Sequence, residues 1–279
     1  MQIKKIIWGI LTTLILAVFF FLPGLISKSG KQKSCEIVFF GDSMIGQARG
    51  EDGIASLLEE KTGKKVLNAA FGGTNMARVD TTHSLAKGND CFSMVALAEA
   101  ACYKDFGPQQ TITITENGTE YFADLVDELS YTDFSKAKII LIEQGTNDYN
   151  SGVPLTQSKG DEDTYTFEGA LRKSIRLVQK MAPGARIIIV TPTFCWFPPK
   201  ETDCEGFRPV GYCLMDYVEL EKKVAKELGV EVIDHYDLFE HDSFDRCFEY
   251  TIDLGVPFKE YYSGKYKKAN SQIKKLLLI

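Results

Sequence analysis

The run Cys35-Glu-Ile-Val-Phe-Phe-Gly-Asp-Ser-Met-Ile-Gly-Gln47 joins an apolar strand to a tight turn at Gly41-Asp42-Ser43. Such a turn can present the hydroxyl of Ser43 as a nucleophile. On its own the pattern is more often an ordinary turn that caps a helix, because aspartate and serine both favour that position. The run therefore predicts that a strand ends before the turn, and it indicates a catalytic serine only in combination with other motifs.

Two later segments also place glycine and amide groups where a strand ends. The first, Asn68-Ala-Ala-Phe-Gly-Gly-Thr-Asn75, follows a short apolar stretch and contains two adjacent glycines. Glycine lets the backbone approach a ligand closely and direct an N–H group at it. The second, Ile139-Ile-Leu-Ile-Glu-Gln-Gly-Thr-Asn-Asp148, is typical of a buried strand that delivers Asn147 and Asp148 to its carboxyl end. In open α/β sheets ligands bind at that edge.

Apolar strands alternate with helical patterns from residue 35 onward. Brief apolar stretches predict buried parallel strands at 36–40, 65–68, 138–143, 186–191 and 230–234. Helical patterns between them predict helices at 54–62, 93–103, 120–129, 167–181 and 214–228. The alternation favours a single α/β domain with a doubly wound parallel sheet. The longer segment 88–135 is expected to add two helices and a small hairpin around 110–119.

The three motifs occur in a fixed order, each after a strand: Gly41-Asp42-Ser43, Gly72-Gly73 and Gly145-Thr146-Asn147-Asp148. Together they resemble the SGNH (GDSL-type) hydrolase family. The resemblance spans the globular part of the chain and implies a three-layer α/β/α, flavodoxin-like domain that hydrolyses esters.

By this resemblance Ser43 attacks the ester carbonyl. The resulting oxyanion would be held by the N–H of Ser43, by the N–H of Gly73, or of Gly72 if the alignment shifts by one, and by the side-chain amide of Asn147. Such donors must be fixed in place, because losing one typically costs on the order of 100- to 1000-fold in rate. No metal ion or organic cofactor is expected.

The family's catalytic histidine does not stand at its expected place in this chain. In the family a histidine follows an aspartate by three residues and usually precedes a proline, whereas the stretch here reads Asp253-Leu-Gly-Val256-Pro257. A serine hydroxyl is a weak nucleophile without a base to accept its proton. The chain has three histidines, His83, His235 and His241. Each could be an ordinary surface or strand-end residue. His241 is the best substitute, because it lies in a loop that could reach the site, and Asp253 would orient a base.

Two functions remain open. The first is a serine-dependent ester hydrolase that removes acyl groups such as acetyl from a carbohydrate, a cell-envelope polymer or a small-molecule ester. Gly72, Asp148 and the loop aromatic Trp196 are then candidate substrate contacts. The second is a catalytically inactive relative that binds a glycan or a partner protein in the same cleft, and Val256 motivates it. The intact oxyanion residues favour the enzyme.

The N-terminus contains an uncharged apolar run from Ile6 to Ile26, long enough to cross a bilayer with about 30 Å of hydrocarbon. Its end lacks the small residues typical of a cleavage site, which favours a retained signal anchor, a transmembrane helix, over a cleaved signal peptide. We expect residues 1–34 to be anchor and tether. Residues 35–279 would form the hydrolase domain outside the cytoplasm, held at the membrane or secreted. The net charge of −6 argues against a nucleic-acid surface.

Three of the seven cysteines, Cys195, Cys204 and Cys213, lie within a long loop after the fourth predicted strand. A disulfide there would pin the loop in an oxidising compartment, whereas reduced thiols would fit a cytoplasmic one. Cys91 and Cys102 could form another pair, although connectivity cannot be read from sequence. A zinc site is disfavoured, because the loop lacks a Cys-x-x-Cys pair and a nearby histidine.

Overall fold

Five parallel strands form the central sheet, in the order β2-β1-β3-β4-β7. Their bounds are Ile37–Gly41 (β1), Val66–Asn68 (β2), Ile139–Glu143 (β3), Arg186–Val190 (β4) and Glu231–Ile233 (β7). All five predicted strands are therefore confirmed to within one residue at either end. With β7 as the fifth strand, the order is the flavodoxin-like one, in which the chain reverses its direction of winding between β1 and β3.

The computed structural model describes residues 33–46, 49–51, 53–79, 89–111, 119–156, 162–197 and 202–238. Residues 1–34 were expected to hold the anchor and tether, and the apolar run at 6–26 lies outside the described residues. No helix within the described ranges is long and apolar enough to cross a membrane.

Both faces of the sheet are buried, because side chains alternate along each strand. Val38, Phe40, Ile140, Ile142 and Ile189 face one hydrophobic cluster. Their neighbours Ile37, Phe39, Ile139, Leu141 and Ile188 face a second cluster. This two-sided burial explains why the strands appear in the sequence as continuous apolar runs.

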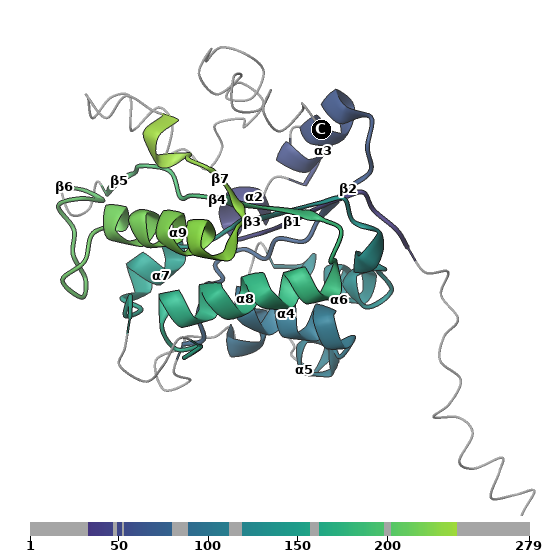
Figure 1. Cartoon of the computed structure of the whole chain (residues 1–279), viewed down its shortest axis with the longest axis horizontal. Helices are drawn as coiled ribbons and strands as arrows, with labels where there is room; N and C mark the ends of the chain where they lie inside the picture. The colour runs from purple at the N-terminus through teal and green to yellow at the C-terminus, as the bar shows by residue number, and fades with distance from the viewer. Residues whose placement is uncertain are drawn as a thin grey trace, which may run out of the picture. The chain divides into compact units, whose positions relative to one another are not determined.

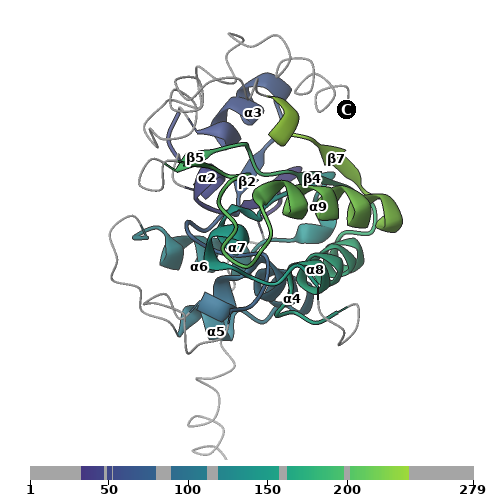
Figure 2. The same cartoon turned by 90° about the vertical axis from the view of Figure 1, so that its left-hand side faces the viewer.

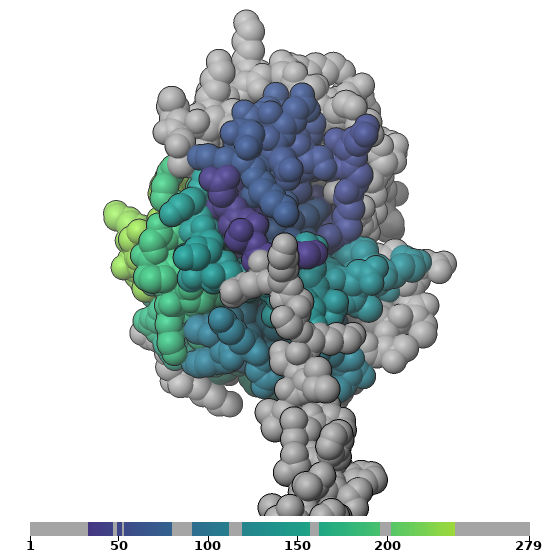
Figure 3. Space-filling model, turned by 90° about the vertical axis from the view of Figure 1, so that its right-hand side faces the viewer, coloured from purple at the N-terminus to yellow at the C-terminus, as the bar shows by residue number. Residues whose placement is uncertain are grey.

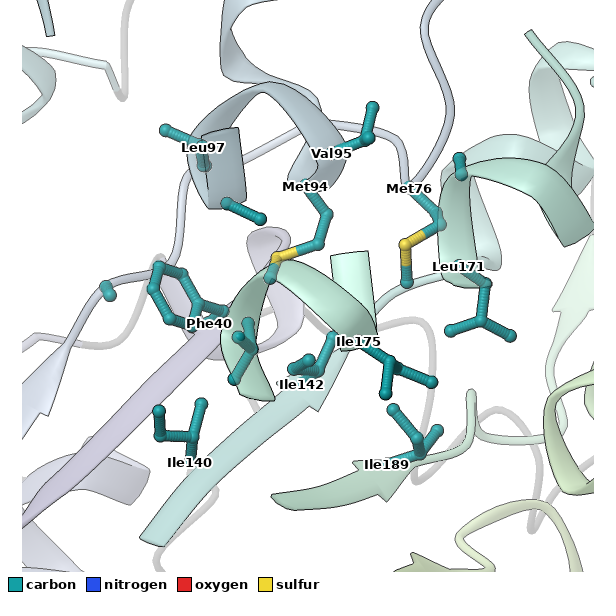
Figure 4. Packing of buried hydrophobic residues seen from close by; sticks show 14 of the residues in the cluster. Phe40, Met76, Met94, Val95, Leu97, Ile140, Ile142, Leu171, Ile175 and Ile189 are labelled. Atoms are coloured by element: carbon teal, nitrogen blue, oxygen red, sulfur yellow. The ribbon is translucent and has the colours of Figure 1, made fainter. Parts of the chain in front are cut away.

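Helices cover the two faces (Figures 1 and 2). On the face of the first cluster lie α4 (Met94–Tyr103), α6 (Phe122–Ser130), α8 (Phe167–Met181) and α9 (Leu214–Leu228). The opposite face carries α3 (Ile54–Thr62). Figure 4 shows side chains of α4 and α8 packed on those of the central strands. Figure 3 views the molecule from the side on which β2 is labelled in Figure 1, and the blue residues there, which include α3, lie above the teal residues, which include α6.

The helix boundaries follow from capping residues. Gly63 and Gly229 end α3 and α9 in the left-handed conformation, with φ of 63° and 68°. The hydroxyl of Thr166 accepts the N–H of Gly169 at 3.2 Å and so caps the first turn of α8. Predicted and observed bounds agree for these three helices.

Shorter elements were not predicted. They are α2 (Ser43–Gly46), α5 (Gly107–Gln110), α7 (Thr146–Ser151), the 3₁₀ turns at Asn89–Phe92, Phe134–Lys136 and Tyr236–Leu238, and the strands β5 (Trp196–Phe197) and β6 (Thr202–Asp203). The hairpin expected around 110–119 is wrong at its start, because Gln110 ends a helix, and residues 112–118 lie outside the described part.

Replacing Gly169 by alanine is expected to destabilise the fold, although Gly169 lies in a helix. A Cβ at this position would come within 2.6 Å of the backbone nitrogen of Asp163. Alanine is favoured over glycine by about 1 kcal/mol in helix interiors, but this overlap with backbone should outweigh that gain. We expect Gly169→Ala to lower the free energy of unfolding in urea by about 1–3 kcal/mol. Gly184→Ala, where a Cβ meets nothing within 4 Å, serves as the control. A higher free energy of unfolding for Gly169→Ala than for wild type would contradict the close packing of Gly169 against the Asp163 backbone.

Candidate active site

The site lies where the chain reverses its winding, at the carboxyl ends of β1 and β3. Ser43 follows β1 directly, and Asn147 lies in the first turn of α7 after β3. The glycine loop, residues 69–75, follows β2 on the other side of β1. In sheets of this topology the crevice at the reversal is the usual place for a ligand.

The turn that carries Ser43 is held by Asp42. The Asp42 carboxylate accepts the N–H of Met44 at 2.8 Å, and its backbone carbonyl accepts the N–H of Gly46 at 2.7 Å. These bonds close the single turn of α2. Ser43 is half-buried, and neither its N–H nor its hydroxyl is bonded to any described residue. As far as the described residues go, both groups therefore remain open to a bound ligand.

Gly41 must be glycine for this turn to pack. A Cβ there would come within 2.9 Å of the Ile45 side chain and 3.3 Å of the Glu143 carbonyl oxygen. The close approach of β1 to α2 and β3 therefore leaves no room for a side chain. This contact explains the glycine that precedes Asp42 in the motif.

The side-chain amide of Asn147 joins all three motif segments. Its nitrogen donates to Asp42 Oδ2 at 3.0 Å and to the backbone oxygen of Thr74 at 2.9 Å. Asp42 is fully buried, and that burial raises its pKa to about 6. The Asn147 amide thus ties the serine turn to the glycine loop.

The glycine loop lies against the serine turn. The N–H groups of Ala69 and Phe71 bond to the carbonyls of Phe39 and Gly41 in β1, at 2.8 and 3.0 Å. A Cβ built on Gly72 would lie 3.7 Å from the Cβ of Ser43. The loop therefore runs along β1 until it reaches the candidate nucleophile.

The two glycines of the loop differ in hydrogen bonding. The N–H of Gly72 donates to the hydroxyl of Tyr121 at 2.8 Å. The N–H of Gly73 has no partner among the described residues, and the φ of 73° at Gly73 is a conformation that favours glycine. Gly73 consequently offers a backbone donor directly after Gly72, the residue that lies next to Ser43.

Asp148 is buried beneath the site. Its carboxylate accepts the N–H groups of Met76 and Ala77 at 2.7 and 2.9 Å, and its side chain is shielded from solvent. Burial raises the pKa of Asp148 to about 7, although the two N–H groups favour the ionised form. Asp148 thus anchors the end of the glycine loop, and substrate contact by this residue stays a prediction.

The raised pKa of Asp148 gives a testable pH dependence. The folded chain retains this proton up to about pH 7, whereas the unfolded chain releases it near pH 3.8. Stability therefore falls as pH rises between these values, because the unfolded state binds fewer protons. From pH 5 to pH 8 we expect wild type to lose about 2 kcal/mol relative to Asp148→Asn in urea unfolding. If the free energy of unfolding changed with pH in the same way for both proteins, the burial of an ionisable group at this position would be contradicted.

A model of the GDSL-like lipase/acylhydrolase family matches residues 39–253, which include all three motif segments. The chain belongs to this family. No curated protein matches it. One solved crystal structure has a TM-score of 0.55 at 18% identity, covering 88% of this chain and 96% of that one.

Two further structures are less similar. A protein from Lactobacillus plantarum has a TM-score of 0.48 at 16% identity, covering 87% of this chain and 95% of that chain. A carbohydrate acetylesterase from Sinorhizobium meliloti has a TM-score of 0.46 at 14% identity, covering 88% of this chain and 100% of that chain. The family assignment rests on the family model, and the first crystal structure supports the fold.

The position at which the family has its catalytic histidine is Val256 in this chain, and it is not among the described residues. Asp253, Val256 and the candidate substitute His241 lie outside the described part, as does His83. His235 is described and follows β7, which β3 and β4 separate from β1. Its backbone N–H bonds to Thr191 at 2.8 Å, and burial lowers its pKa to about 4. His235 therefore serves as a strand-end residue of the core.

The loop after β4 forms a small hairpin. Trp196, predicted as a substrate contact, pairs through its backbone with Asp203 in β6. Within the described part of the chain, no disulfide joins Cys195, Cys204 and Cys213 to one another or Cys91 to Cys102. No described group of three or more ligand-type side chains could hold a metal ion.

Sequence reasoning missed several residues that build the site. Asp42 belongs to the first motif, but its bond to Asn147 was not foreseen. Thr74 and Tyr121 were not singled out at all. Thr74 contributes a backbone carbonyl, which any residue could supply. Tyr121 precedes α6 in a segment with no motif, so no sequence signal could have found it.

Proposed function

We propose that this protein is a serine-dependent ester hydrolase, an acyl or acetyl esterase. The observation that carries the proposal is the Asn147 amide, which bonds to both Asp42 and Thr74 and so gathers the serine turn, the glycine loop and the third motif at one point. Membership of a lipase/acylhydrolase family supports ester hydrolysis as the reaction class. The position of the cluster at the reversal of the sheet supports it further.

In the proposed reaction the Ser43 oxygen attacks the carbonyl carbon of the ester. The carbonyl oxygen becomes an oxyanion, which the N–H groups of Ser43 and Gly73 and the amide of Asn147 would stabilise. Because Gly72 already donates to Tyr121, Gly73 is the better second donor. An Asn147 N–H would be shared between the oxyanion and its present acceptor. Asp148 holds the loop, and its predicted contact with substrate remains part of the proposal.

The Ser43 proton must pass to a base, and the leaving alcohol must receive a proton as it departs. We propose His241, oriented by Asp253, as the substitute for the histidine that Val256 replaces. For the substrate we propose an acylated carbohydrate or cell-envelope polymer, with Gly72 and Trp196 near it. This choice rests on the predicted N-terminal anchor, which would hold the domain outside the cytoplasm at the membrane, or release it by secretion.

Val256 also favours a second candidate: an inactive relative that binds a glycan or a partner protein in the same place. Hydrolysis of a small activated acetyl ester by the purified chain, with Ser43→Ala beside it, separates the two. Hydrolysis that depends on Ser43 supports the esterase. Equal background rates in both proteins would favour the binding function.

A further inference from the structure

The Tyr121 hydroxyl occupies the space between the serine turn and the glycine loop. It accepts the N–H of Gly72 at 2.8 Å. A Cβ added to Gly46 would come within 2.8 Å of it, and one added to Gly72 within 3.4 Å. Gly46 ends the turn that begins at Ser43. The hydroxyl therefore fits into a gap that two glycines leave open beside the nucleophile.

The Tyr121 ring is held in place by Arg49. The guanidinium of Arg49 lies 3.8 Å from the ring centroid. Arg49 also donates to the carbonyl of Asn68, at 3.2 Å, and to the carbonyl of Ala70. A planar guanidinium suits this arrangement, since it can stack on a ring and direct several N–H groups at once. Arg49 thus links the phenol to the beginning of the glycine loop.

These contacts hold the glycine loop on both sides of the Gly73 N–H, which has no partner among the described residues. Before Gly73, the peptide of Gly72 is held by Tyr121; after it, the carbonyl of Thr74 is held by Asn147. Two consecutive glycines would otherwise let these peptides rotate easily. An oxyanion donor is effective only when its position is set before the reaction.

We propose that Tyr121 is a positioning residue for the oxyanion donor: its hydroxyl fixes the Gly72 peptide, and thereby the orientation of the Gly73 N–H beside Ser43. The inference rests on the proposed function, because it assigns the Gly73 donor a role in ester hydrolysis. Arg49 supports Tyr121 by stacking on its ring.

The test is Tyr121→Phe, which keeps the ring and its stacking on Arg49 but removes the acceptor for Gly72. We expect kcat to fall about 10- to 100-fold with KM within about two-fold, because the donor acts mainly in the transition state. The pH–rate profile should keep its shape. Loss of one limb of that profile would overturn the proposal, since it would mean that Tyr121 transfers a proton.

Tyr131→Phe is the matched control. Tyr131 adjoins the other end of α6, and its hydroxyl is bonded to no described residue. Its removal should leave kcat unchanged. Arg49→Lys is a second variant, which keeps the charge but loses the planar group, and kcat should fall about five-fold or more. Unchanged kcat in both Tyr121→Phe and Arg49→Lys would overturn the proposal.

Hydrogen exchange separates this inference from the proposed function. In Tyr121→Phe the amide of Gly72 should exchange at least about ten-fold faster, whereas those of Met76 and Ala77, bonded to Asp148, should not change. This result does not require hydrolysis. Unaltered Gly72 exchange would refute the positioning role, whereas hydrolysis independent of Ser43 would refute the proposed function alone.

Discussion

Replacing Ser43 by alanine is expected to reduce the hydrolysis of a small acetyl ester at least about 1000-fold, to the background rate. The structure gives a direct reason: the Ser43 hydroxyl is bonded to no described residue and lies beside the glycine loop. Alanine removes the nucleophile without altering Asp42, which closes the turn. The measurement is kcat/KM with an activated acetyl ester, together with urea unfolding to show that the fold is retained.

Ser130→Ala provides the control for Ser43→Ala. The Ser130 hydroxyl bonds to the carbonyl of Asp127 at an exposed position on α6, so its loss should leave kcat/KM unchanged. Residual activity of Ser43→Ala above one tenth of wild type would exclude Ser43 as the nucleophile. Hydrolysis would then need a different group, such as an activated water molecule.

Replacing Asp148 by alanine is expected to lower the free energy of unfolding by about 2–5 kcal/mol and to abolish hydrolysis with it. The carboxylate is the acceptor for the N–H groups of Met76 and Ala77. Each buried donor left without a partner costs about 1–3 kcal/mol. The loop end would lose its anchor, so the oxyanion donor upstream would lose its fixed position. Urea unfolding at pH 7 measures the first effect.

Asp133→Ala is the matched control for Asp148→Ala. The Asp133 carboxylate also accepts two hydrogen bonds, from the N–H and the hydroxyl of Ser135, but at an exposed position. Water can replace the lost acceptor there, so the cost should stay near 1 kcal/mol or below. Equal destabilisation of the two variants would show that burial is not the cause.

The sequence predicted the sheet well, for a physical reason. Strands buried on both faces are apolar along most of their length, so β1, β3 and β4 each contain four consecutive residues of isoleucine, valine, leucine or phenylalanine. The three motifs come at the ends of β1, β2 and β3, which is why their positions after strands also predicted where they would meet.

What the sequence could not show depends on contacts between distant segments. Asp148 was expected to contact substrate, because an aspartate after a strand end resembles an open ligand position. Its partners Met76 and Ala77 lie more than 70 residues away in the chain. Tyr121 reaches Gly72 across 49 residues. No local pattern records such pairs, because any hydrogen-bonding side chain at the right place in space would serve.

The Asn147 bonds also determine when the site can form during folding. They join Asn147 to Asp42 across 105 residues and to Thr74 across 73. Contacts between such distant residues require long loops to close, and they form late because loop closure costs entropy. During synthesis the serine turn emerges from the ribosome first and lacks its partners until the whole of β3 and α7 has followed. An assembled cluster of Asp42, Thr74 and Asn147 therefore reports that this half of the sheet has folded.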